Sequence, residues 1–309
     1  MKGYQFEDTQ GTFHLKKAEN ISYLYFPIAG EAGLKSSLTP NLGGDAKIDQ
    51  NTFLLEPVSA ENLVNNRNSR SFWCNVKGIG SWSLTGNSAE ALSKKFTEMQ
   101  DDSEVTAGFM WQKTTRKSKK YQLRGEILSF IPVEKNVEVM LVTITNTGRM
   151  AQTVTPTAAI PLYGRSADNI RDHRHVTSLL HRIETTDTGV LVTPTLSFDE
   201  RGHQVNHMTY YCVGWSGNGE KPVDFYPTAE DFVGEGGNFE RPYAIVKNAE
   251  GVKAGTRIEG LEAVGGLHFS EVTLGPEEEC SYLIFTGITE AIQEIRNLSK
   301  TYTTRERVL

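Results

Sequence analysis

Cysteine is scarce in this sequence of 309 residues. Only Cys74, Cys212 and Cys280 are present, and they lie far apart. An odd number of widely spaced cysteines argues against a disulfide framework and against a cysteine-based zinc site. We therefore expect a protein of the reducing cytoplasm that folds without disulfides.

Long apolar runs are missing as well. No stretch approaches the roughly 18 apolar residues that a membrane-spanning helix needs. Residues 1–7 (MKGYQFE) lack the apolar core of a signal peptide. The sequence therefore predicts a cytosolic protein without a membrane partner.

A surplus of positive charge is also absent. Lysine and arginine number 32 against 38 acidic residues, so the formal net charge is −6. A nucleic-acid partner is not expected, because such proteins carry basic residues that neutralise phosphates. Hydrophobic residues make up 38% of the chain, a balance typical of a globular protein rather than a disordered one.

Catalytic signatures are missing too. Nothing resembles a Ser-His-Asp nucleophile motif. The glycine run at residues 234–237 is not followed by the Lys-Ser/Thr of a phosphate-binding loop. Glycoside cleavage with inversion needs an acid carboxylate near the leaving oxygen, and no Asp or Glu stands in a context that marks it.

Strand patterns dominate what is present. Residues 137–145 (VEVMLVTIT) form the clearest strand, and residues 152–162 are the expected antiparallel partner across a short Asn/Gly turn. Short strands with frequent turn signals predict an all-β sandwich of two large antiparallel sheets. The other expected strands are residues 20–30, 189–198, 208–215, 243–247, 267–274 and 279–286.

Two helices are expected. In residues 87–100, Asn87 and Glu90 have the spacing of a capping box, and Leu92, Phe96 and Met99 share one apolar face that would pack on a sheet.

The second helix covers residues 290–302, after the final strand. Ile292, Ile295 and Leu298 form its apolar stripe. No Gly or Pro stop follows, and the closing Val-Leu resembles the start of another amphipathic turn. We therefore expect the chain to be part of something longer.

The most unusual segment is residues 169–182, which contains Arg171, Asp172, His173, Arg174 and His175. Three interpretations are open. The two histidines, alternating in a strand, would face one side and could bind zinc. Alternatively, Asp172 pairs with a neighbouring arginine in a polar network at a domain or protomer interface. A third interpretation is contact with sugar or phosphate, since arginine and histidine supply suitable hydrogen-bonding groups.

Two aromatic segments offer further candidates. Residues 224–242 combine Tyr226 with carboxylates and glycines, which suits either a sugar site or a structured surface loop. Residues 67–75 contain Trp73, and Trp82 follows. Either indole would serve as a sugar platform or as part of the core, and Cys74 is expected to be inert core.

These segments together carry a family resemblance. Residues 169–182, with Tyr25-Phe26-Pro27, residues 72–75 and residues 225–234, resemble the cellobiose phosphorylase family of inverting glycoside phosphorylases, glycoside hydrolase family 94. Within it, the 1,2-β-oligoglucan phosphorylases are most similar. The resemblance covers essentially the whole chain, but only the front part of such enzymes.

The resemblance implies a two-sheet antiparallel super-sandwich similar to galactose mutarotase at residues 1–288. Residues 289–309 would begin a helical linker to an (α/α)6 barrel that carries the catalytic Asp and most phosphate ligands. No catalytic residue is then expected in this chain, which alone would be inactive.

The reaction implied for the parent enzyme is reversible phosphorolysis of a β-glucoside. Inorganic phosphate, the co-substrate, attacks the anomeric carbon with inversion and releases α-glucose 1-phosphate. No metal or organic cofactor is implied. The expected partners are β-glucan oligosaccharides, the catalytic barrel and a second protomer of a homodimer.

Two other functions remain open on the same sandwich. One is a free-standing enzyme of the aldose-epimerase type, with His173 or His175 as the acid and a glutamate base that the sequence does not identify. The other is a carbohydrate-binding module.

Overall fold

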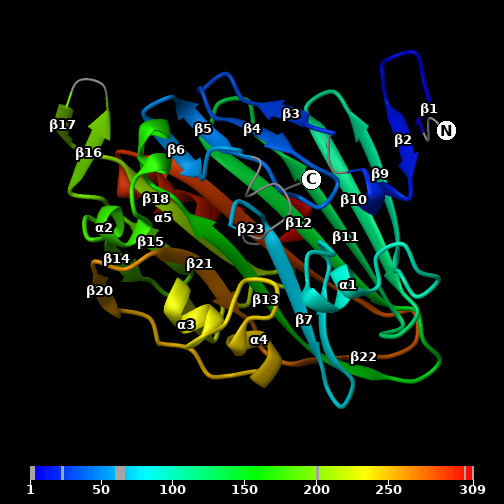
Figure 1. Cartoon of the computed structure of the whole chain (residues 1–309). Coiled ribbons are helices and arrows are strands. Elements are labelled where there is room, and N and C mark those ends of the chain that lie inside the picture. Colours follow the sequence, from blue (N-terminus) through cyan, green and yellow to red (C-terminus); the bar gives the residue numbers. More distant parts are fainter. Residues whose placement is uncertain (1–3, 22–23, 60–66, 200–201, 303, 308–309) are drawn as a thin grey trace.

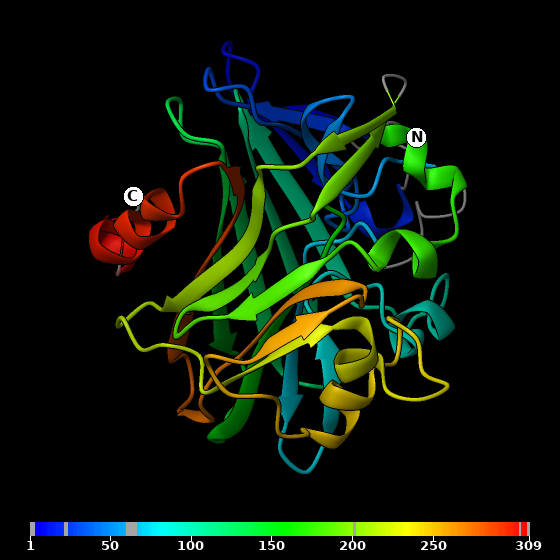
Figure 2. The same ribbon diagram turned by 90° about the vertical axis from the view of Figure 1, so that its left-hand side faces the viewer.

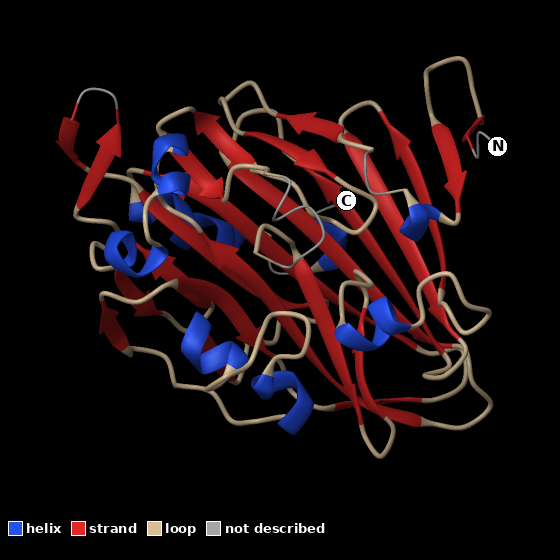
Figure 3. Ribbon diagram, viewed as in Figure 1, coloured by secondary structure: helices blue, strands red, loops and turns tan. Residues whose placement is uncertain are grey.

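The structure is a computed structural model that describes residues 4–21, 24–59, 67–199, 202–302 and 304–307. Strands dominate these residues, and the helices are short (Figure 3). All strand pairs among them are antiparallel. The expectation of an all-β protein with antiparallel sheets and few helices is confirmed.

The largest sheet contains eleven of the described strands and spans the molecule (Figure 1). In spatial order they are β1 (Tyr4–Phe6), β2 (Phe13–Lys16), β9 (Asp102–Gly108), β10 (Trp111–Ser118), β11 (Leu123–Phe130), β12 (Val137–Asn146), β23 (Glu279–Thr289), β18 (Thr209–Ser216), β15 (Gly189–Val192), β14 (Arg182–Thr185) and β20 (Arg257–Glu259).

Two smaller sheets pack on one face of this large sheet. The first contains β19 (Asp224–Thr228), β21 (Ala263–His268), β13 (Gln152–Leu162), β7 (Ser71–Val76) and β8 (Gly80–Ser83), with β22 (Val272–Leu274) paired to β13. The second contains β3 (Phe26–Ala29), β4 (Lys35–Leu38), β5 (Ala46–Asp49) and β6 (Thr52–Leu55). A separate hairpin is formed by β16 (Leu196–Asp199) and β17 (Gly202–Val205).

Some of the short helices cover outer faces of the sheets. The described residues form α1 (Ala89–Ser93), α2 (Arg174–Ser178), α3 (Ala229–Val233), α4 (Tyr243–Lys247) and α5 (Ile292–Thr301), with 3₁₀ turns at Ala18–Asn20, Ala167–Arg171 and Arg305–Arg307. Figure 2 shows α5 (red) on the opposite side of the molecule from α3 and α4 (yellow). None of these helices is long and apolar enough to cross a membrane.

The main hydrophobic core lies between the large sheet and the two smaller ones. One continuous cluster of buried side chains includes Leu54 of β6, Phe72 of β7 and Val142 of β12. Each of these strands belongs to a different sheet. The sandwich is therefore held together chiefly by burial of apolar surface.

The strand β12 is apolar on both of its faces because both are covered. Val142 faces the main core, whereas Val139 and Leu141 pack in a second cluster with Ile295 and Leu298 of α5. A strand covered on both faces has an almost continuous hydrophobic sequence, which explains why residues 137–145 are so easily recognised.

A buried ion pair ties the large sheet to the second small sheet. Arg70 and Glu138 are both 0% exposed, and the guanidinium donates from Nε to Oε1 at 2.7 Å and from Nη2 to Oε2 at 2.9 Å. Arg70 also donates to the carbonyl oxygen of Gly44, and Ser36 Oγ donates to Glu138. A side chain at Gly44 would clash with the backbone oxygen of Ser37, because a Cβ atom there would lie 1.9 Å from it.

Three local expectations were wrong. Residues 152–162 form β13, which pairs with β21, β7 and β22 in the smaller sheet, whereas β12 pairs with β11 and β23. The Asn/Gly segment is therefore a corner between sheets rather than a hairpin. Residues 243–247 form α4, with Pro242 at its N-cap, instead of a strand.

The third concerns the helix expected at residues 87–100, which is only α1. Ser88, not Asn87, caps it by accepting a hydrogen bond from the Ala91 amide at 3.1 Å. The helix ends at Ser93, and the positive φ of Phe96, 67°, is incompatible with its continuation; the Phe96 side chain is 80% exposed. The expected apolar face does not pack on the sheet.

Candidate functional site

Three segments that the sequence singles out meet at Glu262. Arg174 donates from Nη1 to Glu262 Oε1 at 2.7 Å and from Nη2 to Glu56 Oε2. Arg67 Nη1 lies 3.5 Å from Glu262 Oε1, and its guanidinium lies 5.6 Å from the ring centre of Phe239. We call Arg67, Arg174, Glu56 and Glu262 the charged cluster.

The ends of regular elements position this cluster. Arg174 begins α2, and Glu262 immediately precedes β21. The carbonyl oxygen of Glu262 accepts a hydrogen bond from the Ala229 amide at the start of α3. Glu56 is the most buried member, with its side chain 7% exposed, against 40% for Arg67. The cluster therefore links three surface segments while its outer part remains accessible to a ligand or partner.

One hollow lies beside α2, and another adjoins the charged cluster. The first, here the α2 groove, has a volume of about 800 Å³ and an apolar lining that includes Val176, Leu179 and Phe198. The second has a volume of about 590 Å³ and lies at the glycine loop, residues 234–240, with Arg67 and Glu262 in its wall. Both volumes are sufficient for a small organic ligand.

The Arg/His segment is helical rather than extended. Residues Ala167–Arg171 form a 3₁₀ turn, and α2 begins at Arg174, so His173 and His175 do not share a strand face. Asp172 accepts a hydrogen bond from Asn169 Nδ2 at 2.9 Å instead of pairing with a neighbouring arginine. Arg171, Asp172, His173 and His175 are exposed. The described residues contain no group of three potential metal ligands.

Trp73 and Tyr226 lie beneath α3 and α4. Each side chain is 2% exposed, and both belong to a cluster with Phe232 and Ile245. The Tyr226 hydroxyl donates to the carbonyl oxygen of Ala249. In this arrangement neither ring presents a face to solvent for stacking on a sugar.

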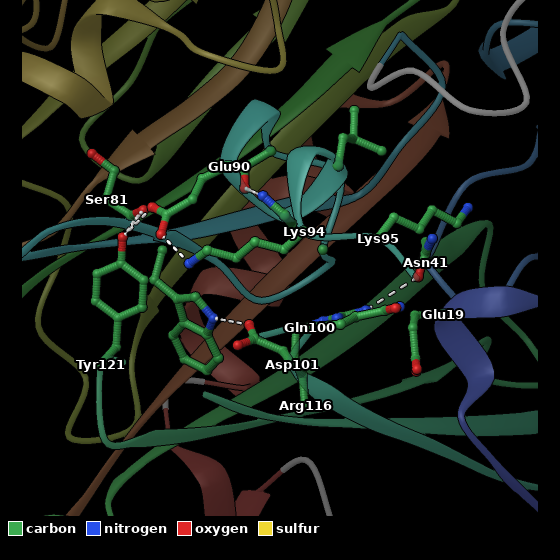
Figure 4. Close-up of a pocket in the computed structure, with 15 residues that line it drawn as sticks. Glu19, Asn41, Ser81, Glu90, Lys94, Lys95, Gln100, Asp101, Arg116 and Tyr121 are labelled. Atoms are coloured by element: carbon green, nitrogen blue, oxygen red, sulfur yellow. Dashed lines mark hydrogen bonds and ion pairs between the residues drawn. The ribbon is translucent and has the colours of Figure 1, made fainter. Parts of the chain in front are cut away.

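A third cavity lies beneath α1 (Figure 4) and is too small for a sugar. Its volume is about 30 Å³, enough for one or two water molecules. Partial burial raises the pKa of Glu90, but hydrogen bonds from Lys120, Lys94 and Tyr121 outweigh this and lower it to about 2. Glu90 therefore anchors α1 as a carboxylate, in place of its expected capping role.

Sequence reasoning missed Glu56, Glu262 and Arg165. Arg165 follows β13 and is 5% exposed. None of these residues stands in a recognisable motif, because their partners come from distant segments. The one sequence feature that they share is a charged residue just before or just after a strand.

The layered antiparallel sheets form a sandwich of one large and two smaller sheets. Residues 58–305 match the family model of the Glycosyl hydrolase 94 supersandwich domain. This match covers most of the chain, and the chain therefore belongs to that family.

Several solved structures are similar to this chain at low sequence identity. A bacterial glucoamylase complexed with acarbose has a TM-score of 0.50 and 8% identity, over 91% of this chain and 35% of that one. A protein assigned as a kojibiose phosphorylase from the human microbiome has a TM-score of 0.48 and 8% identity, over 100% and 37%. A protein assigned as an aldose 1-epimerase from Escherichia coli K12 has a TM-score of 0.45 and 9% identity, over 86% and 99%.

The chain thus spans about a third of the length of the first two proteins. No curated protein sequence matches it.

Proposed function

We propose that this chain is the N-terminal, carbohydrate-handling and structural domain of an inverting β-glucan oligosaccharide phosphorylase, and that it is not catalytic alone. The observation that carries the proposal is the match of residues 58–305 to the Glycosyl hydrolase 94 supersandwich domain. The 1,2-β-oligoglucan specificity rests on the sequence resemblance described above.

The charged cluster supports a role at an interface or beside a substrate rather than in acid catalysis. Glu56 and Glu262 both accept hydrogen bonds from Arg174. A general acid must carry a proton that it can deliver to the leaving oxygen. Carboxylates that are already engaged by one guanidinium are poorly suited to that task.

The surface beside the cluster suits a protein partner. Val176 and Leu179 are 58% and 53% exposed, and both line the α2 groove. Exposed apolar side chains rimmed by charged ones are typical of interaction surfaces. In the proposed parent enzyme, this face would contact the (α/α)6 barrel, and a homodimer is a further expectation.

The proposed reaction requires little from this domain. Phosphate is the nucleophile, so no water-activating base is needed, and the proposal includes neither a metal nor an organic cofactor. Its substrates are β-glucan oligosaccharides and inorganic phosphate, its compartment is the cytoplasm, and no nucleic acid or membrane takes part.

The test is a phosphorolysis assay on the purified chain. With β-1,2-linked gluco-oligosaccharides and phosphate, we expect no glucose 1-phosphate, detected through coupled NADPH formation. A full-length 1,2-β-oligoglucan phosphorylase is the positive control. Turnover by the pure chain that disappears when one of its own carboxylates is replaced would contradict the proposal.

One observation favours an aldose-epimerase-like activity as the second candidate. His268 Nδ1 lies 2.7 Å from Asp224 Oδ1, which supplies a histidine and a carboxylate in hydrogen-bond contact. Both side chains are almost fully buried. Polarimetry of freshly dissolved glucose separates the two functions, since only the epimerase would accelerate mutarotation and lose that activity in His268→Gln.

A further inference from the structure

The hollow at the glycine loop has three side chains in its wall that contact one another. Arg67 Nη1 lies 3.5 Å from Glu262 Oε1, and the Arg67 guanidinium lies 5.6 Å from the ring centre of Phe239. All three residues line this one hollow, which has a volume of about 590 Å³ and is here called the glycine-loop hollow. A hydrogen-bond donor, an acceptor and an aromatic ring therefore stand together at one place.

The glycine loop that closes the hollow is held in one shape. It joins α3 to α4 (Figure 1), and the Gly237 amide donates to the carbonyl oxygen of Gly234 at 3.1 Å. A Cβ atom at Gly237 would lie 1.9 Å from the carbonyl oxygen of Val233, so this turn requires glycine. The carbonyl oxygen of Glu240 accepts from the Ala89 amide of α1 at 2.8 Å. A hollow that is already formed costs a ligand little ordering of the protein.

The charges in the wall restrict the ligand. The described lining has the carboxylates of Glu230, Glu235, Glu240 and Glu262 and the guanidinium of Arg67. Four carboxylates repel an anion such as phosphate, and the guanidinium opposes a cation. A hydroxyl group suits both kinds of wall group, because it can donate to a carboxylate and accept from a guanidinium.

The Arg67–Glu262 pair is suited to two hydroxyls of one ring. Arg174 holds the Glu262 carboxylate in place by donating to Oε1 at 2.7 Å. An ionised carboxylate offers about four acceptor sites, so Glu262 can accept from a hydroxyl while it binds both arginines. The side chains of Arg67 and Glu262 are 40% and 22% exposed, which leaves the pair accessible from the hollow.

The rest of the lining supplies apolar surface. Ala229, Val233 and Phe239 line the same hollow as the polar groups. Apolar walls with a few convergent polar groups suit a sugar, whose C–H face packs on the apolar part while the polar groups hold its hydroxyls.

We propose that the glycine-loop hollow is a binding subsite for a neutral glucosyl unit, with Arg67 donating to one hydroxyl and Glu262 accepting from another. This inference deepens the proposed function and rests on it for the choice of a β-glucan. It places the subsite on the glycine-loop side of the charged cluster, apart from the α2 groove proposed to face the barrel.

The experiment is calorimetric titration of the purified chain with a β-1,2-linked glucose disaccharide and, separately, with inorganic phosphate and with the diamine putrescine. We expect saturable binding of the disaccharide and none of the two ions. Arg67→Met should weaken disaccharide binding about tenfold or more, as expected for the loss of one charge-assisted hydrogen bond. Glu262→Gln should weaken it in the same direction, since a neutral amide oxygen is a weaker acceptor than a carboxylate.

The matched control is Arg182→Met. Arg182 is 42% exposed and its Nε lies 3.5 Å from Glu259 Oε2, so it resembles Arg67 in exposure and pairing but lies outside the hollow. Thermal unfolding of each variant separates binding from folding. Both arginine variants should keep the melting temperature of the wild type, because exposed pairs contribute little to stability. If Glu262→Gln does not fold, Arg67→Met decides alone.

Three outcomes would overturn the proposal. They are no disaccharide binding by the wild type, disaccharide binding that Arg67→Met weakens no more than Arg182→Met does, and binding of phosphate or putrescine in place of the disaccharide. None of them affects the phosphorolysis assay, whose result decides the proposed function independently.

Discussion

Glu138→Gln removes the charge from a fully buried ion pair and keeps the shape of the side chain. The carboxylate accepts two hydrogen bonds from Arg70 and one from Ser36, and both members of the pair are 0% exposed. The substitution leaves the guanidinium without its counter-charge between two sheets. Breaking a buried pair in this way costs about 3–5 kcal/mol, and we expect the free energy of unfolding to fall by that amount.

Urea unfolding followed by tryptophan fluorescence measures this loss, because three of the four tryptophans are buried in the sandwich. The matched control is Glu271→Gln. Glu271 pairs with Lys77 at 3.2 Å, but the two side chains are 49% and 70% exposed. Exposed pairs contribute less than about 1 kcal/mol, so the control should remain close to the wild type.

The reasoning is refuted if Glu138→Gln and Glu271→Gln change the free energy of unfolding by the same small amount. A double variant, Arg70→Met with Glu138→Leu, refines the test. We expect it to recover part of the loss, because no charge is left unpaired. Recovery should be incomplete, since the carbonyl oxygen of Gly44 loses the donor at 2.7 Å.

Three further predictions follow from local environments. Glu90→Gln should lower stability at pH 7 by less than about 1 kcal/mol. The pKa of Glu90 is lowered to about 2 in the folded chain. The stabilisation by the Glu90 carboxylate is therefore complete above the pKa that glutamate has in the unfolded chain, and it is lost as the pH falls towards 2. Thermal unfolding at several pH values measures this loss. Burial raises the pKa of Cys74 and Cys212, and it raises the pKa of Cys280 to about 11. Ellman's reagent should therefore react slowly with the native chain and rapidly with all three thiols after denaturation. A rapid reaction with the native chain would contradict this burial. Leu298→Ala, which removes buried contacts between α5 and the large sheet, should cost about 2–5 kcal/mol in urea unfolding, and a cost near zero would show that α5 does not cover the sheet.

The fold was predictable where local sequence and burial agree. Residues 137–145, and the part of 279–286 from Tyr282 on, are buried on both faces, and their positions match β12 and β23. The partner of residues 152–162 was not predictable from its turn. Pairing with β7 and β21 depends on chain segments far away, whereas the turn sequence indicates only that the chain reverses.

The sequence indicated one member of the charged cluster but not its partners. The density of charged residues at 171–175 drew attention to Arg174, which the structure places in the cluster. The carboxylates that bind Arg174 lie 118 and 88 residues away in the sequence, at Glu56 and Glu262. A single sequence carries no signal for such a pairing. The expected bond from Asp172 to a neighbouring arginine is not formed, because Asp172 follows the 3₁₀ turn Ala167–Arg171 directly and accepts from the side chain of Asn169 within that turn.

The position of β23 in the large sheet also constrains the order of events during synthesis. This strand lies between β12 and β18, although it is the last of the described strands in chain order. Until residues 279–289 leave the ribosome, the strands on either side have no partner along their inner edges. Unpaired edges of this kind are prone to non-native association. A nascent chain halted before Glu279 should therefore remain open to chaperones, whereas one that extends well beyond Thr289 can close its sheet.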